Sequence, residues 1–129
     1  MASWTNLLLV AGGGAVGSVA RYLITLAASA VPGGSTILGT SLANLIGCAG
    51  IAAVMELSLI DGAISPRLSL ALRVGLFGGL TTFSTFAAES VGLAGSGRHL
   101  PLALYLTANL AGGFAAFWGV SVLLRGWGS

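Results

Sequence analysis

The sequence contains very few charged residues and a single cysteine. Charged side chains make up 6% of its 129 residues, whereas about a quarter is typical of a soluble domain. This scarcity excludes an ordinary water-soluble domain and indicates an integral membrane protein. Cys48 cannot form an intrachain disulfide, so the cysteine count does not identify a redox compartment. We interpret Cys48 as a small packing residue.

Groupings that enzyme or metal chemistry would require are also missing from the sequence. It contains no cluster of cysteine and histidine and no nucleophile paired with a base. His99 follows Gly95-Ser96-Gly97-Arg98, a loop sequence in which a solvated histidine is expected. The sequence therefore predicts a protein that is not an enzyme.

Apolar residues are abundant, at 56% of the chain. Since a membrane-spanning helix needs about 20 apolar residues, the chain has room for four spans and no soluble domain. We predict an all-α membrane protein with one transmembrane domain over residues 1–129 and spans at about 4–28, 36–60, 67–94 and 100–124. Turn sequences separate these spans at Pro32-Gly33-Gly34, Ser65-Pro66 and Gly95-Ser96-Gly97.

A cleaved signal peptide is the alternative interpretation of the N-terminus. Ala28-Ser29-Ala30 looks like a small-residue cleavage site. No Lys or Arg precedes the apolar stretch, and Arg21 lies inside it, so we favour a retained first span.

Arginines are almost evenly divided between the two ends of the predicted bundle. Arg67, Arg73 and Arg125 belong to the side that holds both termini, and Arg21 and Arg98 belong to the other. Because the Lys/Arg bias of short loops sets orientation, a three-to-two split predicts insertion in both orientations. The alternative is that a single arginine or the insertion machinery decides the orientation.

Small residues at intervals of four in the first two spans predict close helix packing. They are Gly13 and Gly17 in the first span, and Gly39, Ala43 and Gly47 in the second. In the third span, glycines are followed directly by hydroxyl residues, which gives a poor helix propensity over residues 78–82. We predict that this helix breaks in mid-membrane, where half-helix ends can hold a cation and an anion. A kink that serves packing alone is the alternative.

Polar and aromatic residues around the predicted break form shared helix faces. Thr40 and Asn44 lie four residues apart, as do Tyr105 and Asn109, and Phe83 and Phe86 lie three apart. Amide and hydroxyl donors, together with the positive edges of aromatic rings, suit a small anion. Arg21 either reaches the membrane interface or forms a positive vestibule. Glu89 either meets the pathway or reaches the interface.

At these residues the chain resembles the CrcB/Fluc family of fluoride channels. The matching residues are Gly13, Gly17 and Arg21-Tyr22, Gly39-Thr40, Asn44 and Gly47, the run from Gly78 to Phe86, and Asn109 with Gly112 or Gly113. The resemblance implies a dual-topology antiparallel homodimer in the bacterial inner membrane. It also implies two fluoride pores along the subunit interfaces and passive export of fluoride from the cytoplasm.

The resemblance assigns roles to individual residues. Asn44, Phe83 and Phe86 match pore residues, and Tyr105, Thr82 and Ser84 match polar groups beside the path. The backbone carbonyls of Gly78 and Thr81, from both subunits, would hold a structural sodium ion. We include Arg21 and Asn109 in the expected fluoride pathway. The chain departs from the family pattern at Ala49 and Ala52, and Asn109 and Gly113 stand where some relatives have hydroxyls.

Two other classes of membrane protein remain as alternatives. A small four-helix, dual-topology multidrug antiporter would match the length and weak charge bias, but its first span carries a glutamate, which this first span lacks. A structural or accessory subunit would explain the glycines, but leaves Asn44, Thr81–Thr85 and the two phenylalanines unexplained.

Overall fold

The computed structural model describes residues 3–60 and 62–127, which form a bundle of helices. Its elements are α1 (Trp4–Ala30), α2 (Thr36–Leu57), α3 (Pro66–Leu70), the π-helix η1 (Ala71–Phe77), α4 (Gly78–Leu80), α5 (Phe83–Gly95) and α6 (His99–Trp127). The four elements from α3 to α5 follow one another as a single bent segment, the third segment. With it, 4 helices of the described chain are long and apolar enough to cross a membrane.

Local signals in the sequence account for the ends of these helices. Ser35 and Ser65 cap α2 and α3, each accepting a hydrogen bond from a backbone N–H three residues ahead. α1 runs two residues beyond the predicted Ala28 and stops where Val31 becomes extended before Pro32. α2 ends at Leu57 rather than at the predicted residue 60, because three-residue turn bonds replace the helix pattern, as in Leu59 N–H to Glu56 O.

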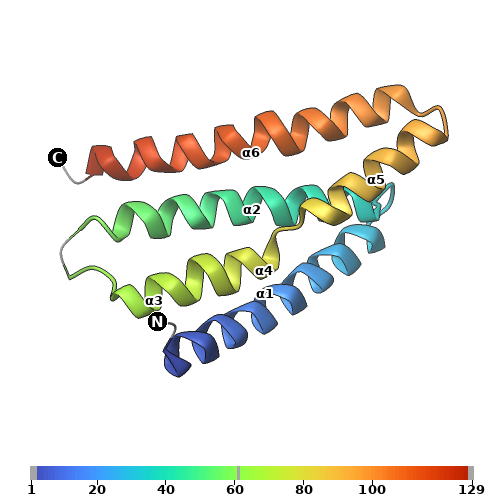
Figure 1. The fold of residues 1–129 in the computed structure, drawn as a ribbon. Coiled ribbons are helices and arrows are strands. Elements are labelled where there is room, and N and C mark those ends of the chain that lie inside the picture. The colour runs from blue at the N-terminus through green and yellow to red at the C-terminus, as the bar shows by residue number, and fades with distance from the viewer. Residues whose placement is uncertain (1–2, 61, 128–129) are drawn as a thin grey trace.

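The helices lie in two pairs (Figure 1). α2 and α6 run side by side, and α1 packs along the first half of the third segment. The first turn of α1, the end of α2 and the last turn of α6 lie at the same end of the bundle (Figure 1). Arg67 and Arg125 lie near this end and Arg73 lies in η1, which follows α3. Arg21 lies in the second half of α1, and Arg98 lies in the turn before α6. This is the three-to-two division that the sequence predicts.

Glycines allow the backbones of α1 and the third segment to touch. A Cβ added to Gly13 would lie 2.5 Å from the carbonyl oxygen of Ala71, and one on Gly17 would collide with the backbone of Leu76. On α2, Ala43 is fully buried and a Cβ on Gly47 would meet the side chain of Thr81. The predicted close packing at these small residues is confirmed.

Large apolar side chains mostly face outward, as expected where lipid or another protein is the neighbour. Phe114 is 78% exposed and Trp118 is 72% exposed, both on α6. The small internal cluster contains Phe86, Leu93 and Tyr105. Positions where single-chain packing is tightest are therefore occupied by small residues rather than by large ones.

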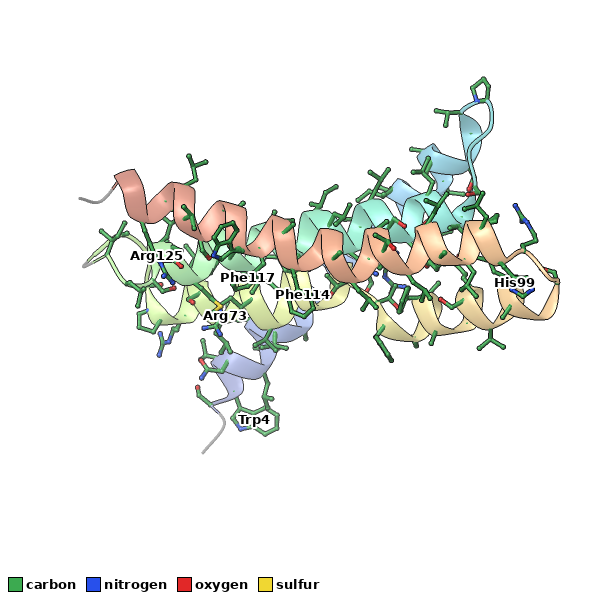
Figure 2. The ribbon with its side chains drawn as sticks, turned by 90° about the horizontal axis from the view of Figure 1, so that it is seen from above. Trp4, Arg73, His99, Phe114, Phe117 and Arg125 are labelled. Carbon is green, nitrogen blue, oxygen red and sulfur yellow. The ribbon has the colours of Figure 1, made fainter. Side chains whose placement is uncertain are left out.

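An ion pair joins α2 to α6 at one end of the bundle. Arg125 Nε donates to both carboxylate oxygens of Glu56 at 3.0 Å, and a terminal guanidinium nitrogen lies 2.8 Å from Oε1. Figure 2 shows Arg125 at the opposite end of the molecule from His99. The ion pair between Glu56 and Arg125 therefore lies at one end of the bundle, away from its middle.

Candidate functional site

The third segment is interrupted between α4 and α5. Thr81 has φ −79° and ψ 154°, and Thr82 has φ −149° and ψ 119°, so both residues are extended. Figure 1 shows the non-helical link between the two helices. The predicted break within residues 78–82 is confirmed, and the structure places it at its last two residues.

Side chains take over hydrogen bonds that a continuous helix would make across the break. In such a helix, the N–H groups of Thr82 and Thr85 would bond the carbonyls of Gly78 and Thr81. Instead, Thr82 N–H donates to Asn44 Oδ1 at 2.8 Å, and Thr85 N–H donates to Thr82 Oγ1 at 3.2 Å. The carbonyls of Gly78 and Thr81 thus lose their helical partners.

Asn44 of α2 holds the extended Thr82 by two hydrogen bonds. Its Oδ1 accepts from Thr82 N–H, and its Nδ2 donates to Thr82 O at 3.2 Å. An extended residue points its own N–H and C=O to the same side, so the amide pairs with it as a residue of a neighbouring strand would. Asn44 therefore stabilises the break as well as facing the space beside it.

Arg21 of α1 contacts the third segment just before the break. Its Nε donates to the carbonyl of Gly79 at 3.3 Å, although the two residues are 58 positions apart. This contact places the guanidinium next to the break, whereas the sequence left it between the interface and a vestibule. A positive charge and a neutral amide from two different helices thus support the same backbone segment.

One pocket beside the break, the aromatic pocket, contains most of the predicted pathway residues. It has a volume of about 270 Å³ and is lined by Asn44, Cys48, Ile51, Thr81, Thr82, Phe83, Phe86, Asn109 and Leu110. The rings of Phe83 and Phe86 lie 5.8 Å apart between centroids. Phe83 is 77% exposed and Phe86 only 7%. The lining contains amide, hydroxyl and ring-edge groups and no carboxylate.

A second pocket, the polar pocket, shares Thr82 with the aromatic pocket. It has a volume of about 460 Å³ and is lined by Ser18, Arg21, Tyr22, Thr25, Thr36, Thr40, Thr82, Thr85 and Glu89. The extended Thr82 therefore belongs to both pockets. The polar pocket contains the Arg21 guanidinium and the Glu89 carboxylate, and the aromatic pocket contains the two phenylalanine rings.

Two predicted pathway residues line neither of these pockets. Tyr105 is 3% exposed, and its hydroxyl donates to Glu89 Oε2 at 2.6 Å. Ser84 is exposed and lies 3.3 Å from the Thr82 hydroxyl oxygen. Glu89, which the sequence left undecided, lines the polar pocket and accepts the Tyr105 hydroxyl proton in a hydrogen bond.

Sequence reasoning missed the role of Ser41. This residue is buried, and its Oγ accepts a hydrogen bond from Asn109 Nδ2 at 3.0 Å. Its position three residues before Asn44 places the two on one face of α2, a signal that was available in the spacing. Thr40 of the polar pocket was identified from its spacing to Asn44, but the hydroxyls of Ser18, Thr25 and Thr36 were missed, because single threonines and serines in an apolar helix carry no distinctive pattern.

Comparisons with known proteins give a consistent result. The family model described as "CrcB-like protein, Camphor Resistance (CrcB)" matches residues 8–120. A protein of Rhodopirellula baltica is 36% identical over 97% of this chain and 97% of its own length. Proteins of Chlorobaculum tepidum and Anaeromyxobacter dehalogenans are 42% and 41% identical, over 95% and 93% of this chain and 96% and 95% of their own lengths. Each is named "Fluoride-specific ion channel FluC". These names describe ion channels, not enzymes.

Proposed function

This chain belongs to the CrcB-like protein family, and we propose that it is a fluoride-selective ion channel that lets fluoride leave the cytoplasm passively. The observation that carries the proposal is the near full-length similarity to proteins named as fluoride-specific channels. The aromatic pocket beside the break supports it, because this pocket offers uncharged donors in mid-membrane and no repelling acid.

Fluoride requires strong replacement of its water shell. Removing a small anion from water costs many kcal/mol unless donors take the place of the water. In the proposed pathway Asn44 and Thr82 supply these donors and Asn109 lies beside them, and the edges of Phe83 and Phe86 add positive potential in the plane of each ring. Such donors discriminate against larger anions, which gain less from short, close contacts.

The polar pocket acts as the entrance in this proposal. Arg21 supplies a positive potential that raises the local anion concentration. Tyr105 and Ser84 lie beside the path, within hydrogen-bonding distance of Glu89 and Thr82 respectively. Their part in the proposal is to orient those neighbours rather than to contact the ion in this state of the protein.

The proposed working unit is an antiparallel homodimer in the bacterial inner membrane. The near-balanced arginines favour insertion in both orientations. Phe83, at 77% exposed, stands at the edge of the aromatic pocket and would be covered by a second copy. Exposed apolar side chains on one chain suit either that copy or lipid.

A structural sodium ion at the dimer centre is the further part of the proposal. Sodium is a hard cation that prefers oxygen ligands. The carbonyls of Gly78 and Thr81 are oxygen donors whose helical N–H partners bond elsewhere, and two copies would supply four oxygens. The ion's positive charge would lower the energy of an anion nearby.

The multidrug antiporter has less support. Such carriers depend on a carboxylate in the first span, and α1 contains no Asp or Glu. The acids that the structure does describe within spans bond Arg125 and Tyr105.

Ion efflux from liposomes tests the function directly. Purified protein is reconstituted into liposomes loaded with potassium fluoride or potassium chloride, and efflux is started with a potassium ionophore and followed with ion-selective electrodes. The proposal predicts rapid fluoride efflux and chloride efflux at the level of protein-free liposomes. Equal efflux of the two anions, or no fluoride efflux, would overturn it.

A further inference from the structure

A continuous chain of side-chain hydrogen bonds connects the break to α6. Thr82 N–H donates to Asn44 Oδ1, and Asn44 Nδ2 donates to Thr82 O at 3.2 Å and to Asn109 Oδ1 at 2.8 Å. Asn109 Nδ2 in turn donates to Ser41 Oγ and to Tyr105 O, both at 3.0 Å. The chain therefore runs from the third segment through α2 to α6.

The direction of every bond in this chain is fixed at its two ends. A backbone N–H can only donate, so Thr82 requires the oxygen of the Asn44 amide to face it. A backbone carbonyl can only accept, so Tyr105 O requires the nitrogen of the Asn109 amide. Neither amide can be rotated by half a turn without placing two donors or two acceptors face to face.

One consequence concerns the donors of Asn44. Its amide nitrogen has two N–H groups, and both are used: one by Thr82 O and one by Asn109 Oδ1. An anion that binds Asn44 must therefore displace one acceptor. Displacing Thr82 O would weaken the pair that holds the break, whereas displacing Asn109 Oδ1 leaves that pair intact.

We infer that Asn109 is a positioning residue whose Oδ1 competes with the permeating anion for one N–H of Asn44. This inference rests on the proposed function and concerns the same pocket. Ser41 and Tyr105 O hold the Asn109 amide so that its oxygen faces Asn44. The competitor limits how tightly the pathway holds fluoride, which suits a pore that must both admit and release its ion.

Removing the competing oxygen should strengthen the apparent binding of fluoride. In Asn109→Leu and Asn109→Ala, Asn44 keeps both bonds to Thr82 and gains a free N–H. We expect the fluoride concentration that gives half-maximal flux to fall roughly fivefold, because one neutral hydrogen bond is worth about 1 kcal/mol. Maximal flux should not rise in proportion, since release becomes harder. If Asn109 had a purely structural role, its variants would lower the maximal flux or the yield of folded protein without lowering the half-saturating fluoride concentration.

Two further variants complete the experiment. Leu104→Ala changes a residue of the same helix that is 63% exposed, lines neither pocket and holds no acceptor, so it should leave the half-saturating concentration unchanged. Ser41→Ala removes one tether of Asn109 and should lower this concentration by a smaller factor, roughly twofold. If the Asn109 variants fail to fold, Ser41→Ala alone tests whether Asn109 competes with fluoride for Asn44.

The outcomes separate the inference from the proposed function. If the unmodified protein moves no fluoride, the proposed function fails. If it conducts, and every folded variant of Asn109 and Ser41 has an unchanged or higher half-saturating concentration, the inference about Asn109 is wrong and the proposed function stands.

Discussion

Asn44 and Glu56 lie on the same helix, and each bonds a different part of the protein, but they do so in different ways. Asn44, in the middle of α2, uses a neutral amide to bond the backbone N–H and C=O of Thr82. Glu56, in the last turn of α2, uses a charge to bond the charged side chain of Arg125. The Asn44 amide replaces backbone hydrogen bonds that the break removes from the third segment. The Glu56 carboxylate instead joins α2 to α6, two helices that have no such break.

The difference follows from depth in the membrane. Charged pairs are tolerated near the ends of spans, where water and headgroups are close, and are costly at the centre. At the centre, a neutral amide satisfies an extended backbone without introducing a negative charge that would repel an anion. We therefore expect changes at the break to affect conduction and changes at the ion pair to affect stability.

The largest loss of conduction is expected for Asn44→Asp. The carboxylate loses the donors that bond Thr82 O and Asn109 Oδ1, and adds a negative charge to the aromatic pocket. Fluoride efflux should fall to the level of protein-free liposomes. Asn6→Asp, the same chemical change in the first turn of α1, is the matched control and should conduct normally, because an acid is favourable at a helix N-terminus. Normal efflux through Asn44→Asp would remove Asn44 from the pathway.

Replacing Phe83 or Phe86 with isoleucine should reduce fluoride flux at least tenfold. The two variants should differ in their effect on the stability of the fold. Phe83→Ile and Phe86→Ile both remove a positive ring edge from the pocket. Only Phe86 is buried and packs on Tyr105, at 5.2 Å between ring centroids, so only Phe86→Ile should also lower the melting temperature.

Phe114→Ile is the control for these two variants, because Phe114 is as exposed as Phe83 and lines neither pocket. If it loses as much flux as Phe83→Ile, the effect is not specific to the aromatic pocket.

Modification of Cys48 should produce a partial block. This residue is the chain's single cysteine, and it lines the aromatic pocket. A small methanethiosulfonate reagent attached there would narrow the pocket, and we expect flux to fall by at least half. Cys48→Ala should conduct and resist the reagent. A thiol-modified protein that conducts at the unmodified rate would place the pathway elsewhere.

The smallest effect on conduction is expected for Glu56→Gln. The variant loses the ion pair with Arg125 but keeps the side-chain shape, and Glu56 lines neither pocket. Because the guanidinium is largely exposed, the pair contributes little and the melting temperature should fall by only a few degrees. Fluoride efflux per protein should be unchanged. A strong loss of flux would contradict the distinction between the two polar groups of α2.

Much of this architecture could be predicted from the sequence, because its signals are local. Long apolar runs mark the spans, glycines at intervals of four mark close packing, and Gly78–Thr82 marks the break by its poor helix propensity. The break was correctly located, although the π-helical turn over Ala71–Phe77 before it was not predicted. Gly75 is a poor helix former within that turn, but a single glycine does not distinguish a π-helical turn from an α-helical one.

Contacts between distant helices could not be derived from spacing. The sequence identified Asn44 and Arg21 as polar groups in apolar spans, but not that both bond the backbone of the third segment. Likewise, Tyr105 was expected beside the path, and only the packing of α5 on α6 brings its hydroxyl to Glu89. The spacing of residues in the sequence shows which of them share a helix face. Which residues of other helices that face contacts depends on the tertiary packing.

The most direct test of the account is a structure of the assembled protein determined in sodium and fluoride. The account predicts two antiparallel copies, with Thr82 of each extended and paired with the Asn44 amide. It also predicts, between the copies, density coordinated by the four carbonyls of Gly78 and Thr81 at distances suited to sodium. A third segment with continuous helical hydrogen bonding through residues 78–82, or parallel copies with no density at these carbonyls, would contradict it.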